Sequence, residues 1–166
     1  VSQIADLGIL GYNVKKYKIA RGIVEAIGSD LEYKDGWLAI RVDFATVDEN
    51  LTVIDRRAGR NIFGLDKIVE DINKMDFEVP FILKRTYGHR GVLIFTKNLS
   101  AEITNSDPLK NGEKVLKIEP TNKKSKKAKE SARIVQSFLE KSYLLMNSHI
   151  INIKREVAGI PKANYL

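Results

Sequence analysis

The clearest pattern in the chain is an alternation of apolar and polar residues between positions 38 and 55. Every second residue over 38–44 is apolar, and the alternation resumes over 51–55 after the turn-forming residues 48–50. A period of two is typical of a strand with one buried face. The pattern therefore predicts a strand, a tight reversal and a second strand, with Arg41 and Asp43 together on the charged face.

Two further segments also follow the pattern of strands. Phe77–Tyr87 and Gly91–Lys97 are rich in apolar and β-branched residues and flank the turn sequence Gly88-His89-Arg90. Val115–Glu119 is a shorter run that ends before Pro120. We expect a pair of strands around the turn and one additional short strand.

Three other segments have apolar residues at the spacing of an α-helix. Ala20–Ile27 is a short amphipathic segment closed by Gly28, and apolar residues recur at helical spacing over 65–72 behind Asp66. The longest helical pattern covers Lys123–Asn147, and its apolar stripe consists of Ala128, Val135, Phe138, Leu139, Ser142, Leu145 and Met146. His149 follows this helix, where a capping or solvent-facing role is commoner than a ligand role.

This order of elements predicts an α+β fold, with a mostly antiparallel or mixed β-sheet and helices packed on it. The 166 residues are 43% hydrophobic and 30% charged, which suits one globular domain with a substantial core. Cysteine is absent, so disulfides and thiolate chemistry are excluded, and a reducing cytoplasm fits. The chain begins with Val1 rather than methionine, and we expect a piece of a longer protein.

The net charge of +7 raises the question of a nucleic-acid partner. Much of the excess lies in a lysine run over 123–129, which contains no interleaved aromatic residues. Such a run is more typical of a solvated helix face than of a phosphate track, and Trp37 fits a core position better than a base-stacking one. No apolar run is long enough to cross a bilayer. We expect a soluble, cytoplasmic protein that binds neither nucleic acid nor membranes.

A second concentration of positive charge follows the central pair of strands. Arg56, Arg57 and Arg60 are separated by Ala58 and Gly59, whose small side chains let a ligand approach the backbone. Guanidinium groups bind phosphate and carboxylate with paired hydrogen bonds. The cluster alone fits either a solvated basic turn or a site for a small anion.

Several motifs in the chain resemble those of the archaeal-type cofactor-independent phosphoglycerate mutases, which belong to the alkaline phosphatase superfamily. The resemblance spans essentially the whole chain. It is carried by Ile9-Leu10-Gly11-Tyr12, Arg21-Gly22, Glu25-Ala26-Ile27-Gly28, Phe44-Ala-Thr-Val-Asp48, Ile54-Asp-Arg-Arg-Ala-Gly-Arg60, His89-Arg90, Asn105-Ser-Asp-Pro108 and Gly159-Ile-Pro-Lys-Ala-Asn164.

This resemblance implies a metal-dependent isomerase that interconverts 2- and 3-phosphoglycerate through a phosphoserine intermediate. The nucleophilic serine of the family lies shortly before the Ile-Leu-Gly-Tyr motif, which places Ser2 at that position, where it would also be a metal ligand. Two divalent ions, manganese, magnesium or zinc, are implied for the intact enzyme. Their aspartate and histidine ligands in the family lie outside this stretch, so we expect no metal bound by this chain alone.

The resemblance also implies that most of the chain is an inserted substrate-binding domain. Residues 1–14 would belong to the catalytic domain or form a hinge, residues 15–158 would form the inserted domain, and residues 159–166 would lead back. Asp43 stands where the family has asparagine. The candidate substrate-binding residues are Arg21, Arg41, Asp43, Arg56, Arg57, Arg60, His89 and Arg90. Their partners would be phosphoglycerate and the catalytic domain of the same polypeptide.

Two alternatives remain compatible with these observations. Another phosphoryl- or phosphonate-processing enzyme of the same superfamily would keep Ser2 and the metals and change the arginine pocket. A basic module that binds nucleic acid or another polyanion would need neither. Binding to a polyanion weakens steeply with salt, whereas recognition of one small phosphate ester saturates stoichiometrically, so a salt titration distinguishes the two kinds of binding.

Overall fold

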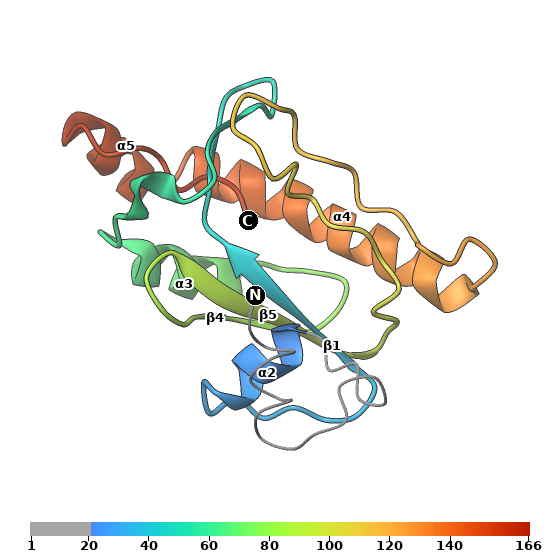
Figure 1. The fold of residues 1–166 in the computed structure, drawn as a ribbon. Helices are drawn as coiled ribbons and strands as arrows, with labels where there is room; N and C mark the ends of the chain where they lie inside the picture. Colours follow the sequence, from blue (N-terminus) through green and yellow to red (C-terminus); the bar gives the residue numbers. More distant parts are fainter. Residues whose placement is uncertain (1–20) are drawn as a thin grey trace, which may run out of the picture.

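The structure, a computed structural model, describes residues 21–166 and combines an antiparallel sheet with helices on both of its faces (Figure 1). The predicted α+β class is confirmed. In chain order the elements are α2 (Arg21–Ile27), β1 (Trp37–Asp43), β2 (Thr46–Val47), β3 (Val53–Asp55), the 3₁₀ turn η1 (Ala58–Arg60), α3 (Leu65–Asn73), β4 (Phe81–Arg85), β5 (Arg90–Asn98), α4 (Lys126–Asn147) and α5 (Ile150–Val157).

The main sheet has the strand order β1-β5-β4, and both pairs are antiparallel. The predicted pair of strands around Gly88-His89-Arg90 is therefore confirmed. Its first strand begins at Phe81 rather than at Phe77. Pro80 lies directly before that strand and has no amide hydrogen to donate to a neighbouring strand.

The central alternation is arranged differently from the prediction. β1 ends at Asp43 and pairs with β5, whereas β2 and β3 form a separate two-stranded sheet. The reversal at residues 48–50 is confirmed, because the Asp48 carboxylate accepts hydrogen bonds from the amides of Asn50 and Thr52. The chain thus changes sheets at residues 44–45, so the two predicted strands do not pair along their length.

The strand predicted over Val115–Glu119 is wrong. Side chains hydrogen-bond the backbone there: the amide of Ile118 donates to Gln136, and the amide of Glu119 donates to Thr104. Only isolated bridges lie nearby, between Thr52 and Lys114 and between Ile103 and Pro120. The amides of Val115 and Leu116 donate instead to the carbonyls of Leu51 and Ser106, so the partners of this segment are scattered over loops and side chains rather than aligned along one strand. Sequence periodicity does not report such partners.

The two longer predicted helices are confirmed, although α4 begins at Lys126 rather than at Lys123. α3 buries all four of its apolar residues, and α4 begins behind Ser125, whose hydroxyl accepts a hydrogen bond from the Ala128 amide. The apolar stripe of α4 is buried or partly buried, while the lysines at its start are exposed, as a solvated face requires. α5 was not predicted. His149 is its N-cap, so the capping role is confirmed, with the ring accepting a hydrogen bond from the Ile151 amide.

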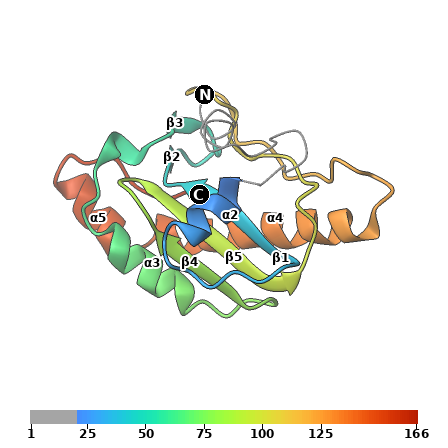
Figure 2. The same cartoon turned by 60° about the horizontal axis from the view of Figure 1, so that its bottom comes forward.

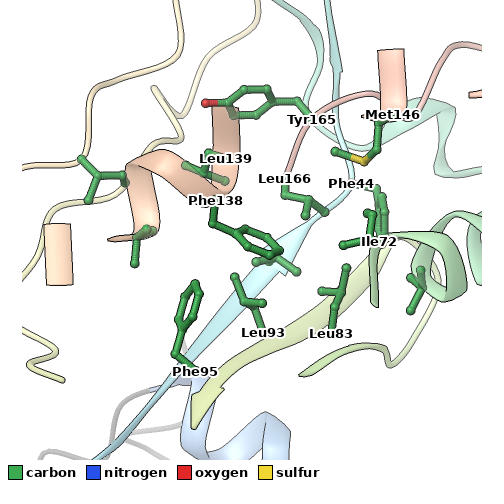
Figure 3. Packing of buried hydrophobic residues seen from close by; sticks show 14 of the residues in the cluster. Phe44, Ile72, Leu83, Leu93, Phe95, Phe138, Leu139, Met146, Tyr165 and Leu166 are labelled. Atoms are coloured by element: carbon green, nitrogen blue, oxygen red, sulfur yellow. The ribbon is translucent and has the colours of Figure 1, made fainter. Parts of the chain in front are cut away.

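The main core lies between one face of the sheet and the helices α3 and α4 (Figure 3). The Phe138 ring makes edge-on contacts with Phe77, Phe81 and Phe95 at its centre. The opposite face of the sheet carries a smaller apolar cluster under α2, which lies in front of the strands in Figure 2. Trp37 packs against this second cluster, as its predicted core role requires.

The last residues of the chain are built into the fold. Tyr165 forms a bridge with Ala45, and the Asn164 side chain hydrogen-bonds both backbone groups of Val47. Leu166 reaches the main core beside Phe44 (Figure 3). Among residues 21–166, no helix is long and apolar enough to cross a membrane.

Candidate functional site

The candidate site is centred on Asp43, the last residue of β1. Antiparallel pairing places Asp43 opposite Arg90, the first residue of β5. Arg41 Nη2 donates to Asp43 Oδ2 at 2.8 Å, which confirms that the two residues share a face of the strand. His89 Nε2 lies 3.7 Å from Asp43 Oδ1, and Arg90 Nε lies 3.8 Å from it. The turn between β4 and β5 therefore brings two more predicted site residues to the end of β1.

Asp43 Oδ1 is buried and has no hydrogen-bond partner within the described part of the chain. His89 and Arg90 both lie just beyond hydrogen-bonding distance of this oxygen. A shift of less than about an ångström would bring either donor into range. The carboxylate is thus surrounded by three basic side chains and bonded to one of them, Arg41.

Arg56 reaches the site from the end of β3 and is held by Asp107. The pair is bidentate: Arg56 Nε donates to Oδ1 at 2.8 Å, and Nη2 donates to Oδ2. Burial raises the pKa of Asp107, but the hydrogen bonds from Arg56 and the Leu109 amide outweigh it, and the net pKa is lowered. Asp107 is therefore a charged anchor that fixes the orientation of Arg56.

A cavity of about 440 Å³ opens between these two ion pairs. Its polar end is lined by Arg41, Asp43, Arg56 and Asp107, with Asn105 and Ser106 from the same loop as Asp107. The other end reaches apolar residues of the core, among them Leu93, Leu139 and Tyr165. The Asn105–Pro108 motif thus lies beside the arginines, although sequence reasoning assigned it no role in binding.

Arg57 and Arg60 lie on an exposed turn that directly follows β3. The strand ends at Asp55, so the alternation that would send Arg56 and Arg57 to opposite faces stops there. The Asp55 carboxylate instead accepts hydrogen bonds from the amides of Arg57 and Gly59, both at 2.8 Å. Asp55 therefore shapes the backbone of the turn rather than orienting a guanidinium group.

The pKa of His89 depends on charges from this turn as well as on those from the rest of the site. Burial lowers the pKa of His89, and the positive charges of Arg90, Arg57 and Arg60 lower it further, against the opposing effect of Asp43. Those arginines must lie close enough to His89 for their charges to act on it. The imidazole is consequently neutral near pH 7 and can accept or donate one hydrogen bond.

Arg41 and Arg90 therefore lie beside Asp43, Arg56 lines the same cavity, and the charges of Arg57 and Arg60 lower the pKa of His89. The side chain of Arg21 and all of Ser2 lie outside the described residues. Between residues 22 and 166, no group of three or more histidine, aspartate or glutamate side chains could hold a metal ion. The described part of the chain thus does not fit a two-metal centre.

Sequence reasoning missed two residues that shape the site. Asp107 lies 51 positions from Arg56, within the Asn105–Pro108 motif, which resembles the family but to which the sequence assigned no binding role. Arg155 is fully buried, and its guanidinium group donates to the carbonyl of Ala58 in the arginine turn at 2.9 Å. It lies in α5, which the periodicity did not reveal, so nothing in the sequence pattern pointed to it.

Comparison with known proteins identifies the relatives of this chain. The family model described as 2,3-bisphosphoglycerate-independent phosphoglycerate mutase matches residues 1–152. A protein of that name from Methanosphaera stadtmanae is 43% identical over 99% of this chain and 41% of its own length. A second such protein, from Methanocaldococcus jannaschii, is 39% identical over the same shares of the two chains.

A solved structure shares both the fold and part of the sequence. The cofactor-independent phosphoglycerate mutase from Thermoplasma acidophilum superposes with a TM-score of 0.83 and 31% identity, over 99% of this chain and 44% of that one. The chain thus spans about two fifths of the length of the relatives it matches. By the match of its family model, the chain belongs to the 2,3-bisphosphoglycerate-independent phosphoglycerate mutase family.

Proposed function

We propose that this chain is part of a phosphoglycerate mutase that interconverts 2- and 3-phosphoglycerate in cytoplasmic glycolysis and gluconeogenesis. Ser2 would carry the phosphoryl group, and the arginine cluster around Asp43 would bind the substrate. Residues 15–158 would form the substrate-binding domain, flanked by segments 1–14 and 159–166 that connect it to the catalytic domain. The family membership and the arrangement of the arginines support this proposal.

The observation that carries the proposal is the division of the arginines into two kinds. Arg41 and Arg56 are locked by carboxylates, so their positive charge is largely offset. Arg57, Arg60 and Arg90 are exposed, and only Arg90 lies within 4 Å of a carboxylate among the described residues, that of Asp43, which Arg41 already binds. Their positive charge therefore remains available to an incoming anion. A phosphoglycerate carries a phosphate and a carboxylate, and both suit bidentate binding by guanidinium groups. Two or three arginines with fixed backbones would hold both ends of such a ligand.

His89 supplies the remaining chemistry that this part of the chain can offer. Its neutral imidazole lies 3.7 Å from Asp43, where a glycerate hydroxyl would reach it. It would hydrogen-bond that hydroxyl or take up its proton as the phosphoryl group moves. Ser2 would also be a ligand of the two divalent ions, and we assign their other ligands to residues outside this chain; the ions would activate the nucleophile in the intact enzyme.

The test compares the chain with the longer protein that contains it. We expect the longer protein to interconvert the two phosphoglycerates and the 166-residue chain to fold but to lack this activity. In the longer protein, Ser2→Ala should abolish both turnover and covalent trapping of phosphate. Arg60→Lys should raise KM or lower kcat, because lysine lacks the planar fork.

The matched control is the same arginine-to-lysine change away from the site, Arg133→Lys on the exposed face of α4, where the arginine pairs with Glu78. This variant should behave as the parent protein does. Full mutase activity in Ser2→Ala would overturn the assignment of the nucleophile. Turnover of a different phosphate or phosphonate ester in place of phosphoglycerate would favour another enzyme of the superfamily. Steeply salt-dependent binding to nucleic acid without turnover would favour a polyanion-binding module.

A further inference from the structure

Arg155 in α5 is the largest fully buried side chain of the described residues, and it binds only backbone oxygens there. Its Nε donates to the carbonyl of Pro161 at 2.8 Å. Nη1 donates to the carbonyls of Asn61 and Phe63 at 3.1 and 2.8 Å, and Nη2 to that of Ala58 at 2.9 Å. Between residues 22 and 166 it forms no ion pair with a carboxylate.

Burying a charged guanidinium group costs free energy that its hydrogen bonds must offset. A buried charge loses its hydration, and burial lowers the pKa of Arg155 accordingly. The planar guanidinium has five donors in a fixed geometry, so carbonyls that accept from it are held at defined positions. Three of its four acceptors belong to residues 58–63, the segment that follows Arg57 and contains Arg60. Figures 1 and 2 both place α5 beside this green segment ahead of α3.

The backbone that Arg155 holds adopts an unusual conformation. Ala58, Gly59 and Arg60 all have positive φ, at 45°, 70° and 54°. Two of these are not glycine, and consecutive residues in this region persist only where surrounding contacts enforce them. Asp55 bonds the turn from its exposed side, while Arg155 bonds it from the buried side.

The same guanidinium also fixes the segment that follows α5. Pro161 accepts from Arg155 Nε, and its ring lies against Gly59, where an added Cβ would be 3.1 Å from the proline Cδ. The arginine turn is therefore packed against residues 159–161 as well as hydrogen-bonded to α5. A displacement of either support would move Arg57 and Arg60 relative to Asp43.

We propose that Arg155 is a positioning residue that holds the Arg57–Arg60 turn in the shape that binds the anionic substrate. This inference rests on the proposed function for the identity of the ligand, but not for the mechanical role of Arg155. Arg155 touches no substrate. It acts through the carbonyls of Ala58, Asn61 and Phe63, which set where the exposed guanidinium groups of Arg57 and Arg60 point.

The mechanical role is tested by amide hydrogen exchange on the 166-residue chain. Arg155→Lys and Arg155→Met should speed exchange at the amides of Gly59, Arg60 and Asn61, because the turn that holds these amides loses the guanidinium bonds to the carbonyls of Ala58, Asn61 and Phe63. Exchange in α3 and β5 should change far less. The matched control, Arg133→Met on the surface of α4, should leave the turn unchanged. Unchanged exchange at residues 59–61 in both Arg155 variants would overturn the proposal.

The functional consequence is tested in the longer protein. Arg155→Lys should raise KM for phosphoglycerate by about tenfold or more, since even ångström-scale misplacement of binding groups is expensive. In Arg155→Ala, millimolar guanidinium should occupy the vacated space and return both KM and the rate of amide exchange at the turn to the parent values. The same addition should not restore KM in Arg60→Ala. Faster exchange at the turn with an unchanged KM would overturn the positioning role.

Two outcomes separate this inference from the proposed function. A parent protein without phosphoglycerate activity would contradict the proposed function and leave the exchange experiment as the test of Arg155. If neither Arg155→Met nor Arg155→Ala folds, Asp55→Asn loosens the same turn from its exposed side. An unchanged KM in Asp55→Asn, with faster exchange at the turn, would show that the turn's shape does not decide substrate binding.

Discussion

Asp43 decides the electrostatic character of the candidate site. It places a carboxylate where the resemblance to the family suggested asparagine, beside a site expected to bind an anion. Arg41 offsets this charge directly, and His89 and Arg90 lie within 4 Å of its other oxygen. The one negative charge of Asp43 is therefore shared by Arg41 and Arg90, and the exposed Arg57 and Arg60 keep their positive charge.

The first prediction at this scale concerns the titration of His89. Because burial and three arginines lower its pKa, the ring should titrate below 6.5, the ordinary value for histidine, in the free chain. A bound phosphate ester adds negative charge near the arginines, so saturating 3-phosphoglycerate should raise that pKa. NMR titration of the His89 imidazole protons measures both values. A His89 pKa above 6.5 in the free chain would contradict the arrangement described.

Among the elements, the short helix α5 makes polar contacts with several distant parts of the chain. Its N-cap His149 bonds Asp71 of α3 at 3.1 Å, and its buried face contributes Asn152 and Arg155. Asn152 binds the carbonyls of Met146 and Ala163 and accepts from the Ala163 amide. α5 thus joins α3, the end of α4 and the last residues of the chain through polar contacts rather than through an apolar face.

The prediction for this element is a pH dependence that originates at Asp71. Hydrogen bonds from Lys67, His149 and Lys74 outweigh burial and lower the pKa of Asp71 from 3.8 to about 2. A carboxyl with a lowered native pKa stabilises the fold above the unfolded value, and this stabilisation is lost as pH falls through the native value. Its contribution should therefore be complete above about pH 4 and disappear towards about pH 2.

Thermal unfolding across that pH range tests the assignment. Asp71→Asn should lower the melting temperature at pH 7 and reduce the loss of stability between pH 4 and pH 2. Glu49→Gln, in the exposed turn before β3, is the control and should leave the loss of stability at acid pH unchanged. If Asp71→Asn loses stability at acid pH as the parent does, the pH dependence originates at other carboxylates.

At the scale of the whole molecule, one apolar core supports both the sheet and the segment that carries the arginines. Phe138 of α4 lies at its centre and touches aromatic rings from β4, β5 and the segment before them. Val42, Val53 and Ala58 belong to the same cluster, so β1, β3 and the arginine turn all depend on it. Loss of core packing should consequently disturb the site as well as the fold.

Phe138→Ala is the corresponding prediction. Removing a fully buried phenylalanine ring should destabilise the chain by about 3–5 kcal/mol, through lost burial and the cavity left behind. Equilibrium denaturation measures this change, with an m-value close to that of the parent if unfolding remains two-state. Leu144→Ala, in the same helix but 69% exposed, should cost far less. Equal losses in the two variants would show that the core is not centred on Phe138.

The sequence by itself determined the features that depend on neighbours close along the chain. The stripes of α3 and α4, the turn between β4 and β5, and the reversal at residues 48–50 all follow from local periodicity and turn chemistry. The family motifs also pointed to the arginines. Such signals are readable because each partner lies within a few residues of the other.

Only the tertiary structure decided which distant segments meet. The pairing of β1 with β5 joins Asp43 to Arg90, Asp107 finds Arg56 across 51 residues, and Arg155 reaches the arginine turn across more than 90. The strand predicted at Val115–Glu119 failed for the same reason, since side chains from elsewhere bind its backbone. Polar contacts of this kind produce no repeating pattern in the sequence. A buried donor or carboxylate needs only one partner, and that partner can come from any segment that the fold brings within about 3 Å.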